Sequence, residues 1–298
     1  MNKFKPMKKT FYWLLAIVIT IVAVIYQRKT GPTYDKKLSV NVNDTRYEVK
    51  LVRSIEIGSN TEVKLAIDDK TIAARLFYKQ FMSDDPYQSV DFEYKEKPVD
   101  SYLMNKVFKI TEDKGWFAPV PEQPAAGKIQ YYFEVTDSKG TKMYMNKTPV
   151  VIRFKGAVPS VVLAPHIFFM FFAMLLGNLA GIMAIFKHQR YKFYTTITLI
   201  TLLIGGMILG PIVQLYAFGE AWAGVPFAWD LTDNKTLVAF IFWILAVAMN
   251  RKKERPVFTI VASIVMLIIY SIPHSMYGSQ LDPETGEIIQ GWIQLLII

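Results

Sequence analysis

The alternation of apolar runs with basic segments constrains this chain more than any other feature of its sequence. A helix needs about 20 apolar residues to cross the hydrocarbon core of a bilayer. Five runs are candidates for such helices: residues 11–26, 161–186, 195–218, 236–249 and 257–273. We therefore expect five transmembrane helices, although the first and fourth runs are short for a span.

The charges between the runs predict their direction through the membrane. Cytoplasmic loops of membrane proteins carry an excess of Lys and Arg. Three segments are basic: the one before the first run, the one between the second and third runs, and the one between the fourth and fifth. Their only acidic residue is Glu254. Their basic residues are Lys3, Lys5, Lys8, Lys9, Lys187, Arg190, Lys192, Arg251, Lys252, Lys253 and Arg255. We therefore expect residues 1–10 in the cytoplasm, and we interpret the formal net charge of +9 as a topology signal, with no nucleic acid as partner.

The first apolar run has two interpretations. Residues 11–26 form either an uncleaved transmembrane anchor or a secretory signal peptide. No Ala-x-Ala-like site follows the run, and Ile-Tyr-Gln-Arg at 25–28 is a poor cleavage site. We favour the anchor, and both interpretations place residue 30 onward outside the cytoplasm.

Residues 27–160 have the pattern of a β-sandwich. Short segments that alternate apolar and polar residues, or are continuously apolar between turns, lie at 62–67, 74–79, 128–135 and 150–154. Strands of this length and spacing are typical of sandwiches. Residues 124–137 resemble the late hairpin of fibronectin type III and immunoglobulin-like domains. The chain has no cysteine, so this domain must fold without a disulfide.

These patterns together predict the fold class. We expect a multi-pass α-helical membrane protein with an extracytoplasmic all-β, immunoglobulin-like sandwich domain. The lipid bilayer is then a partner of the chain. The sandwich would be followed by a four-helix transmembrane domain at 161–273 and by an outer C-terminal tail at 274–298.

Two of the three histidines follow a proline at the outer end of a predicted helix: His166 and His274. Ionisable residues at membrane depth are costly and usually functional. Helical spacing places both on faces that we expect to turn inward, with Gln214 at a similar depth. His166 and His274 are therefore candidate metal or cofactor ligands, although either could simply bond a main-chain carbonyl at its helix end.

The outer loop at 218–235 is dense in aromatic and acidic residues. It holds Trp222 and Trp229 together with three carboxylates. Because it is too apolar to stay in water, we expect it to fold back as a lid over the two histidines. Asp233 is the expected N-cap of the fourth helix, which leaves Asp230 as the better functional candidate.

Two parts of this loop, Phe-Gly-Glu-Ala-Trp at 218–222 and Trp-Asp-Leu-Thr-Asp at 229–233, resemble a known signature. It is the Trp-Gly-x-x-Trp-x-Trp-Asp-x-x-Glu motif of the haem-handling membrane proteins of cytochrome c assembly, here with Phe for Trp, Asp for Glu and a longer spacer. The resemblance implies a haem b or metal ion at the outer face. The residues concerned would be His166 and His274 as ligands, Trp222 and Trp229 as walls, and Asp230 or Gln214 as a hydrogen-bond partner.

The membrane portion as a whole resembles a group of uncharacterised bacterial inner-membrane proteins. They share Gly-Pro-x-Val-Gln, here at 210–214, and Asp-Leu-Thr-Asp-Asn-Lys, here at 230–235. This resemblance implies the bacterial inner membrane, with the β domain and the C-terminus in the periplasm. It supplies no activity.

Several functions stay open on the sequence alone. The chain lacks a phosphate-binding Gly-rich loop, His-Glu-x-x-His and Gly-x-Ser-x-Gly. No complete catalytic constellation is seen, so an enzyme, such as a metal-dependent membrane hydrolase, is less expected. We favour an accessory or structural subunit that binds a membrane or periplasmic protein through its outer domain. The alternatives are a haem- or metal-binding electron-transfer or haem-handling protein, and a transporter or channel component.

Overall fold

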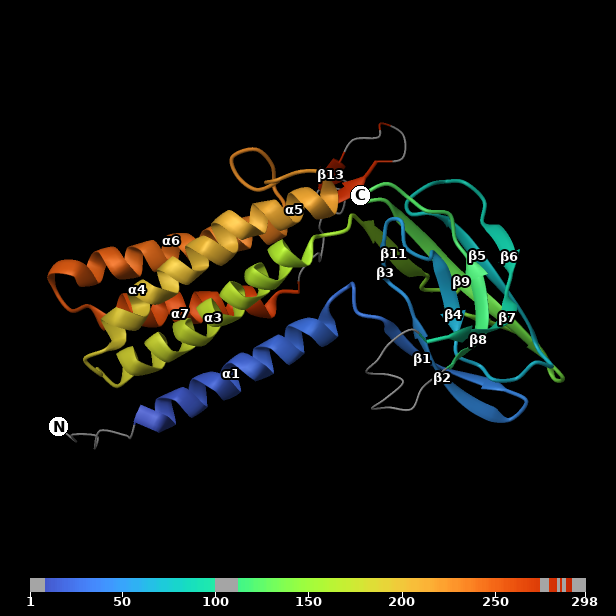
Figure 1. Ribbon diagram of the computed structural model, residues 1–298, viewed down its shortest axis with the longest axis horizontal. Helices are drawn as coiled ribbons and strands as arrows, with labels where there is room; N and C mark the ends of the chain where they lie inside the picture. The colour runs from blue at the N-terminus through green and yellow to red at the C-terminus, as the bar shows by residue number, and fades with distance from the viewer. Residues whose placement is uncertain (1–8, 100–111, 274–278, 283–284, 286–287, 291–298) are drawn as a thin grey trace. The chain divides into compact units, whose positions relative to one another are not determined.

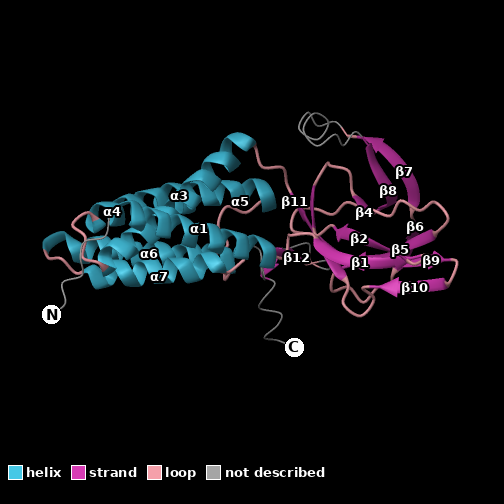
Figure 2. Ribbon diagram, turned by 90° about the horizontal axis from the view of Figure 1, so that it is seen from below, coloured by secondary structure: helices cyan, strands magenta, loops and turns pink. Residues whose placement is uncertain are grey.

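The computed structural model describes residues 9–99, 112–273, 279–282, 285 and 288–290. The chain divides into two compact units, a helical unit (Met1–Pro32, Gly156–Ser279 and Ile289–Ile298) and a β unit (Thr33–Lys155 and Gln280–Ile288). Figure 1 traces the chain through them, and Figure 2 colours the helices of the first unit and the strands of the second.

The helical unit contains a helix at each of the five apolar runs. Its elements are α1 (Lys9–Thr30), α3 (Ser160–Ile185), α4 (Tyr191–Leu202), the π-helix η1 (Leu203–Leu209), α5 (Gly210–Phe218), α6 (Leu231–Lys252) and α7 (Pro256–Ser271). Four helices are long and apolar enough to cross a membrane: α1, α3, the continuous helix Tyr191–Phe218, and α6. The fifth, α7, is apolar but has only 16 residues.

Small residues let the helices approach closely. On α1 the buried residues Tyr12, Ala16, Thr20 and Ala23 follow helical spacing and form one face. On α3 the glycines of a Gly-x-x-x-Gly pair, Gly177 and Gly181, pack against α7: a Cβ added at Gly177 would lie 2.7 Å from Met266 Sδ. Glycine at such positions permits the tight packing on which helix association in lipid depends.

The described strands between residues 33 and 155 form two larger sheets and one hairpin. The first sheet has the order β3 (Ser54–Glu56), β11 (Val150–Lys155), β9 (Lys128–Asp137), β5 (Ala73–Gln80) and β6 (Gln88–Asp91), with β10 (Gly140–Tyr144) also paired to β9. The second has the order β4 (Glu62–Leu65), β8 (Glu112–Pro119) and β7 (Glu93–Pro98). The hairpin is β1 (Lys36–Val42) with β2 (Thr45–Leu51), and β12 (Ser279–Leu281) pairs with β13 (Ile288–Gln290) in a further two-stranded sheet. Strands β3 and β11 are parallel, and the other described pairings of the larger sheets are antiparallel.

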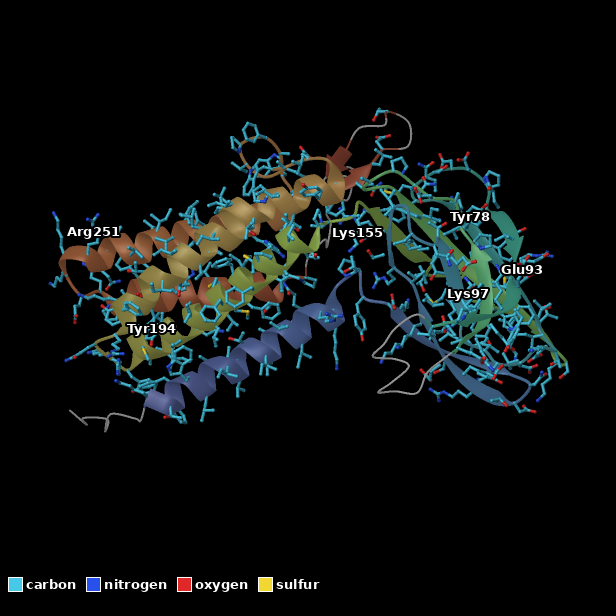
Figure 3. All side chains as sticks on the ribbon, in the orientation of Figure 1. Tyr78, Glu93, Lys97, Lys155, Tyr194 and Arg251 are labelled. Carbon is cyan, nitrogen blue, oxygen red and sulfur yellow. The ribbon has the colours of Figure 1, made fainter. Side chains whose placement is uncertain are left out.

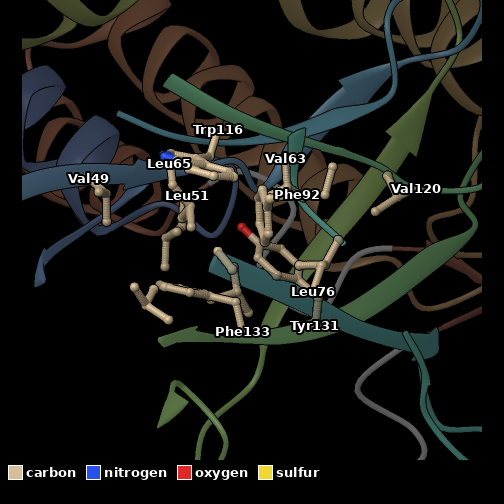
Figure 4. Close-up of a cluster of buried hydrophobic side chains, with 14 of the residues drawn as sticks. Val49, Leu51, Val63, Leu65, Leu76, Phe92, Trp116, Val120, Tyr131 and Phe133 are labelled. Atoms are coloured by element: carbon tan, nitrogen blue, oxygen red, sulfur yellow. The ribbon is translucent and has the colours of Figure 1, made fainter. Parts of the chain in front are cut away.

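Both larger sheets and the β1–β2 hairpin bury their apolar faces in one hydrophobic cluster (Figure 4). Alternation along the strands produces it, because every second side chain of a strand points to the same face. In β9 the residues Ile129, Tyr131, Phe133 and Val135 are buried, whereas those between them are only partly so. Trp116 of β8 also belongs to the cluster, and its indole N–H donates to the carbonyl of Asp69 at 3.0 Å.

A segment from beyond α7 completes the β unit. The Leu281 N–H donates to the carbonyl of Ala126 at 3.2 Å. Lys128 Nζ donates to Gln280 Oε1 at 3.2 Å, and Gln280 is buried. The β unit is therefore built from two stretches of the chain that are far apart in sequence.

Candidate functional site at the loop end of the helices

The two ends of the helical unit differ in chemistry. At one end two of the basic segments meet: Lys192 pairs with Glu254 at 3.2 Å, and Tyr191 donates to Asn250 at 2.6 Å. Arg251 and Tyr194, labelled in Figure 3, lie toward this basic end. The opposite end, here called the loop end, carries the start of α3 and residues 219–230, because the helices run antiparallel.

Asp230 starts α6. Its carboxylate accepts the N–H groups of Thr232 at 2.7 Å and of Asp233 at 3.2 Å. The expectation that Asp233 caps this helix is therefore wrong. Asp230 is the last residue with an extended backbone, so its side chain reaches the unpaired N–H groups of the first turn, whereas Asp233 already lies within the helix.

Asp233 instead joins the loop to two helices. It is buried, and its Oδ2 accepts the Ala223 N–H at 2.6 Å and the Gln214 side-chain amide at 3.0 Å. Gln214 was a predicted site residue. Its partner Asp233 was predicted only as the N-cap of the fourth helix, and the bond between the two was not predicted. A signal was present in the sequence: an acid three residues after a good cap, at the start of an apolar helix, must have a partner if its face turns inward.

Lys235 is a site residue that sequence reasoning missed. Its buried ammonium donates to the carbonyls of Ile272 at 2.8 Å and Pro273 at 3.4 Å. The last carbonyls of a helix have no partner within it and carry partial negative charge. Lys235 therefore ties the start of α6 to the end of α7. Its signal was that it is the one basic residue in a loop that is otherwise acidic.

His166 contacts the middle of the third membrane-competent helix. It is half-buried, and its Nδ1 lies 2.9 Å from the carbonyl oxygen of Gly205. That carbonyl belongs to the π-helix η1. A carbonyl can only accept, so Nδ1 carries the hydrogen and Nε2 is the acceptor of the neutral ring.

The second predicted histidine cannot be placed beside the first, since His274 lies outside the described residues. Its neighbour Pro273 is buried, and the carbonyl of Pro273 accepts a hydrogen bond from Lys235. A shared site for His166 and His274 therefore stays a prediction.

The tryptophans of the loop have different environments. Trp222 is half-buried and donates to the carbonyl of Val225 at 3.2 Å. Trp229 is 57% exposed and Phe227 is 79% exposed. The tip of the loop thus presents its apolar side chains outward. The expected lid over the two histidines stays a prediction, because His274 lies outside the described residues.

The loop end is acidic. Burial, with a smaller effect of the nearby Asp230, raises the pKa of the Glu220 carboxyl above its ordinary value. Within the described part of the chain, no group of three or more His, Asp or Glu side chains could hold a metal ion. The arrangement joins α5, the loop, α6 and α7 through side-chain bonds to main-chain groups, and it leaves one imidazole nitrogen, Nε2 of His166, with acceptor character.

Comparisons of this chain with protein-family models, curated proteins and solved structures found no match.

Proposed function

We propose that this chain is an integral membrane protein of the bacterial inner membrane, with its basic end in the cytoplasm and its β unit in the periplasm. Four helices of sufficient length and apolarity support the membrane assignment. The contact between two basic segments, 187–192 and 251–255, at one end of the helical unit supports the orientation.

We further propose that the β unit is an immunoglobulin-like sandwich. In that fold a three- or four-stranded sheet packs on a sheet that contains the last strands of the domain. The order β4-β8-β7 facing β3-β11-β9-β5-β6 supports this assignment. The shared core between the two sheets supports it as well.

The function that we propose is that of an accessory or structural subunit that binds a partner protein through the β unit. The observation that carries this proposal is an aromatic cluster on the outer face of the first sheet. Phe77 and Tyr132 are paired across β5 and β9 and stack at 4.8 Å between ring centroids. Tyr87 meets Tyr132 edge-on at 4.9 Å. We call Phe77, Tyr87 and Tyr132 the aromatic face.

An aromatic face is unusual on the outside of a sandwich. The outer face of an antiparallel sheet is normally polar, whereas the neighbours Leu76, Tyr131 and Phe133 already fill the core. Half-exposed tyrosine and phenylalanine side chains are enriched at protein interfaces, where a few of them contribute most of the binding energy. The hydrogen bond from Gln130 to Tyr87 at 2.7 Å holds one ring in place before any partner arrives.

The test is whether the aromatic face is needed for a complex of fixed stoichiometry. The full chain would be purified from its own membranes in mild detergent, alongside a variant with Phe77→Ser, Tyr87→Ser and Tyr132→Ser. The control carries Arg46→Ser and Glu48→Ser, an exposed ion pair elsewhere in the same unit. We expect wild type and control to run with a stoichiometric partner and the aromatic variant to run alone. Retention of the partner by a folded aromatic variant would contradict the proposal.

A second candidate function has one observation in its favour. A histidine that binds haem or a metal usually donates its other ring N–H to a carbonyl or carboxylate, which fixes the tautomer. The bond of His166 Nδ1 to Gly205 has this form and leaves Nε2 as the ligand atom. We propose haem b or metal binding by His166 as the alternative.

An absorption spectrum tests the alternative. After reconstitution with haemin in detergent, a Soret band that is lost in His166→Ala and kept in His188→Ala would support it, since His188 lies at the basic end. The same haem spectrum in both variants would exclude haem binding by His166. A wild-type protein that binds neither haem nor a metal ion would exclude the alternative altogether.

A further inference from the structure

The tip of the outer loop carries an inference beyond the partner-binding function. We propose that residues 224–229 form an interfacial lipid anchor, whose apolar tip inserts between the headgroups of the leaflet at the loop end. The tip presents three apolar side chains to the outside. Val225 is 40% exposed, Phe227 is 79% exposed and Trp229 is 57% exposed.

The conformation of the tip is stabilised by hydrogen bonds from its main-chain N–H groups. The Val225 N–H donates to Asn234 Oδ1 at 2.8 Å, and the Asp230 N–H donates to the carbonyl of Ala223 at 2.8 Å. The N–H groups of Phe227 and Ala228 both donate to the carbonyl of Gly224 at 3.0 Å. An apolar group that is displayed by a preformed loop loses little conformational freedom when it is buried. The loop is therefore built to present these side chains rather than to hide them.

The position of the tip favours lipid over protein as its occupant. The loop connects two helices that are apolar enough to cross a membrane, so its ends lie at the level where a span leaves the hydrocarbon. The exposed apolar side of α5 at Leu215 and Tyr216 leads up to the loop. Trp and other aromatic side chains are favoured at this interfacial depth.

The charge of the loop specifies how it would bind lipid. Residues 219–234 contain Glu220, Asp230 and Asp233 and no Lys or Arg. A basic surface anchor would be drawn to anionic headgroups. An acidic loop with an apolar tip must instead insert by burying its apolar surface, so its insertion does not require anionic lipid.

The absence of cysteine from the sequence makes a direct test possible. Phe227→Cys in the full chain would carry an environment-sensitive fluorophore in lipid nanodiscs. Quenching by spin-labelled lipid and by aqueous iodide would then be compared. The lipid-side control is Leu215→Cys on α5, and the water-side control is Lys142→Cys on exposed β10.

We expect the label at 227 to be quenched by spin-labelled lipid to at least half the extent seen at 215. Iodide should quench the label at 227 several-fold less than the label at 142. Both results should be the same in zwitterionic and in anionic nanodiscs. Iodide quenching equal to that at 142 would overturn the proposal, and so would protection from both quenchers, which indicates a protein cover. Lipid quenching that needs anionic lipid would overturn the apolar mode of insertion. If the label at 215 were not quenched by lipid, the membrane assignment itself would fail.

Discussion

Asn178 on α3 donates a hydrogen bond to Thr20 Oγ1 on α1 at 3.0 Å, and both side chains are buried. Thr20 in turn donates to the carbonyl of Ala16. Removal of α1 would leave the Asn178 amide facing hydrocarbon, where an unpaired polar group costs several kcal/mol. The first apolar run therefore has the contacts of a permanent member of the helical unit, which supports the anchor over a cleaved signal peptide.

The packing of α1 predicts a contrast between two neighbouring substitutions. Ala16→Leu should destabilise the chain in detergent by about 1–3 kcal/mol, because Ala16 is fully buried and an added side chain overpacks its site. Val18→Leu should be nearly neutral, since Val18 is 56% exposed. Thermal unfolding measures both, and equal effects would mean that α1 does not pack as described.

Asp233 and Gln214 should behave as a coupled pair. Asp233→Leu leaves the buried Ala223 N–H and the Gln214 amide without their acceptor, at a cost of about 1–3 kcal/mol for a buried donor. Gln214→Leu removes only one of the two bonds and should cost less. A double-mutant cycle on unfolding free energies should give a coupling of at least about 0.5 kcal/mol. Additive losses would show that the bond does not contribute.

Lys235 should restrain the end of α7. Lys235→Met keeps the apolar stem but removes the donor to Ile272 and Pro273. We expect hydrogen exchange to accelerate over residues 268–272, which are the last turn of α7 and the residue after it, and to stay unchanged at the basic end. Lys252→Met, at an exposed position in the last turn of α6, is the matched control. The same exchange in both variants would refute the restraint.

The β unit should gain stability as the pH rises above 8. Burial, and after it the nearby charge of Arg153, lowers the pKa of Lys128 from 10.5 to about 8. Between those values the unfolded chain binds more protons than the folded one, so the free energy of unfolding increases with pH. The useful window ends near pH 10, because Tyr131, whose pKa burial raises well above 10.0, acts in the opposite direction beyond it.

Denaturant unfolding of the β unit within the full chain, followed by far-ultraviolet circular dichroism, measures this effect. The midpoint should rise from pH 8 to pH 10 in the wild type. In Lys128→Met the rise should disappear. A rise that persists in the variant would assign the pH dependence to another group.

The orientation in the membrane predicts the accessibility of single cysteines. Gln189→Cys and Glu254→Cys, at the basic end, should resist an impermeant thiol reagent in spheroplasts and react after lysis. Lys142→Cys in the β unit should react before lysis. Labelling at 189 or 254 from outside would reverse the proposed topology.

The positions of the helices and of several strands could be predicted from the sequence because both depend on local patterns. A run of apolar residues such as 161–186 forms a helix whatever its neighbours are, and here α3 spans Ser160–Ile185. The alternation at 128–135 likewise placed β9, because a strand that covers a core shows its period along the chain. Strands β1 and β2 were not singled out, although they pair with each other across a short turn. The part of the chain after α7 that joins the β unit was not singled out either, since its partners lie far away in sequence.

The candidate site was decided by the tertiary structure. The sequence identified Gln214, Asp230 and His166 as residues of interest, because polar groups stand out among apolar runs. It did not show that Asp230 and not Asp233 caps α6, that Gln214 binds Asp233, or that Lys235 holds the end of α7. Each of these contacts depends on where a backbone turns and which main-chain groups another element leaves unpaired. Those facts exist only once the helices have packed, and so the sequence by itself determined the elements, while the fold determined their polar partners.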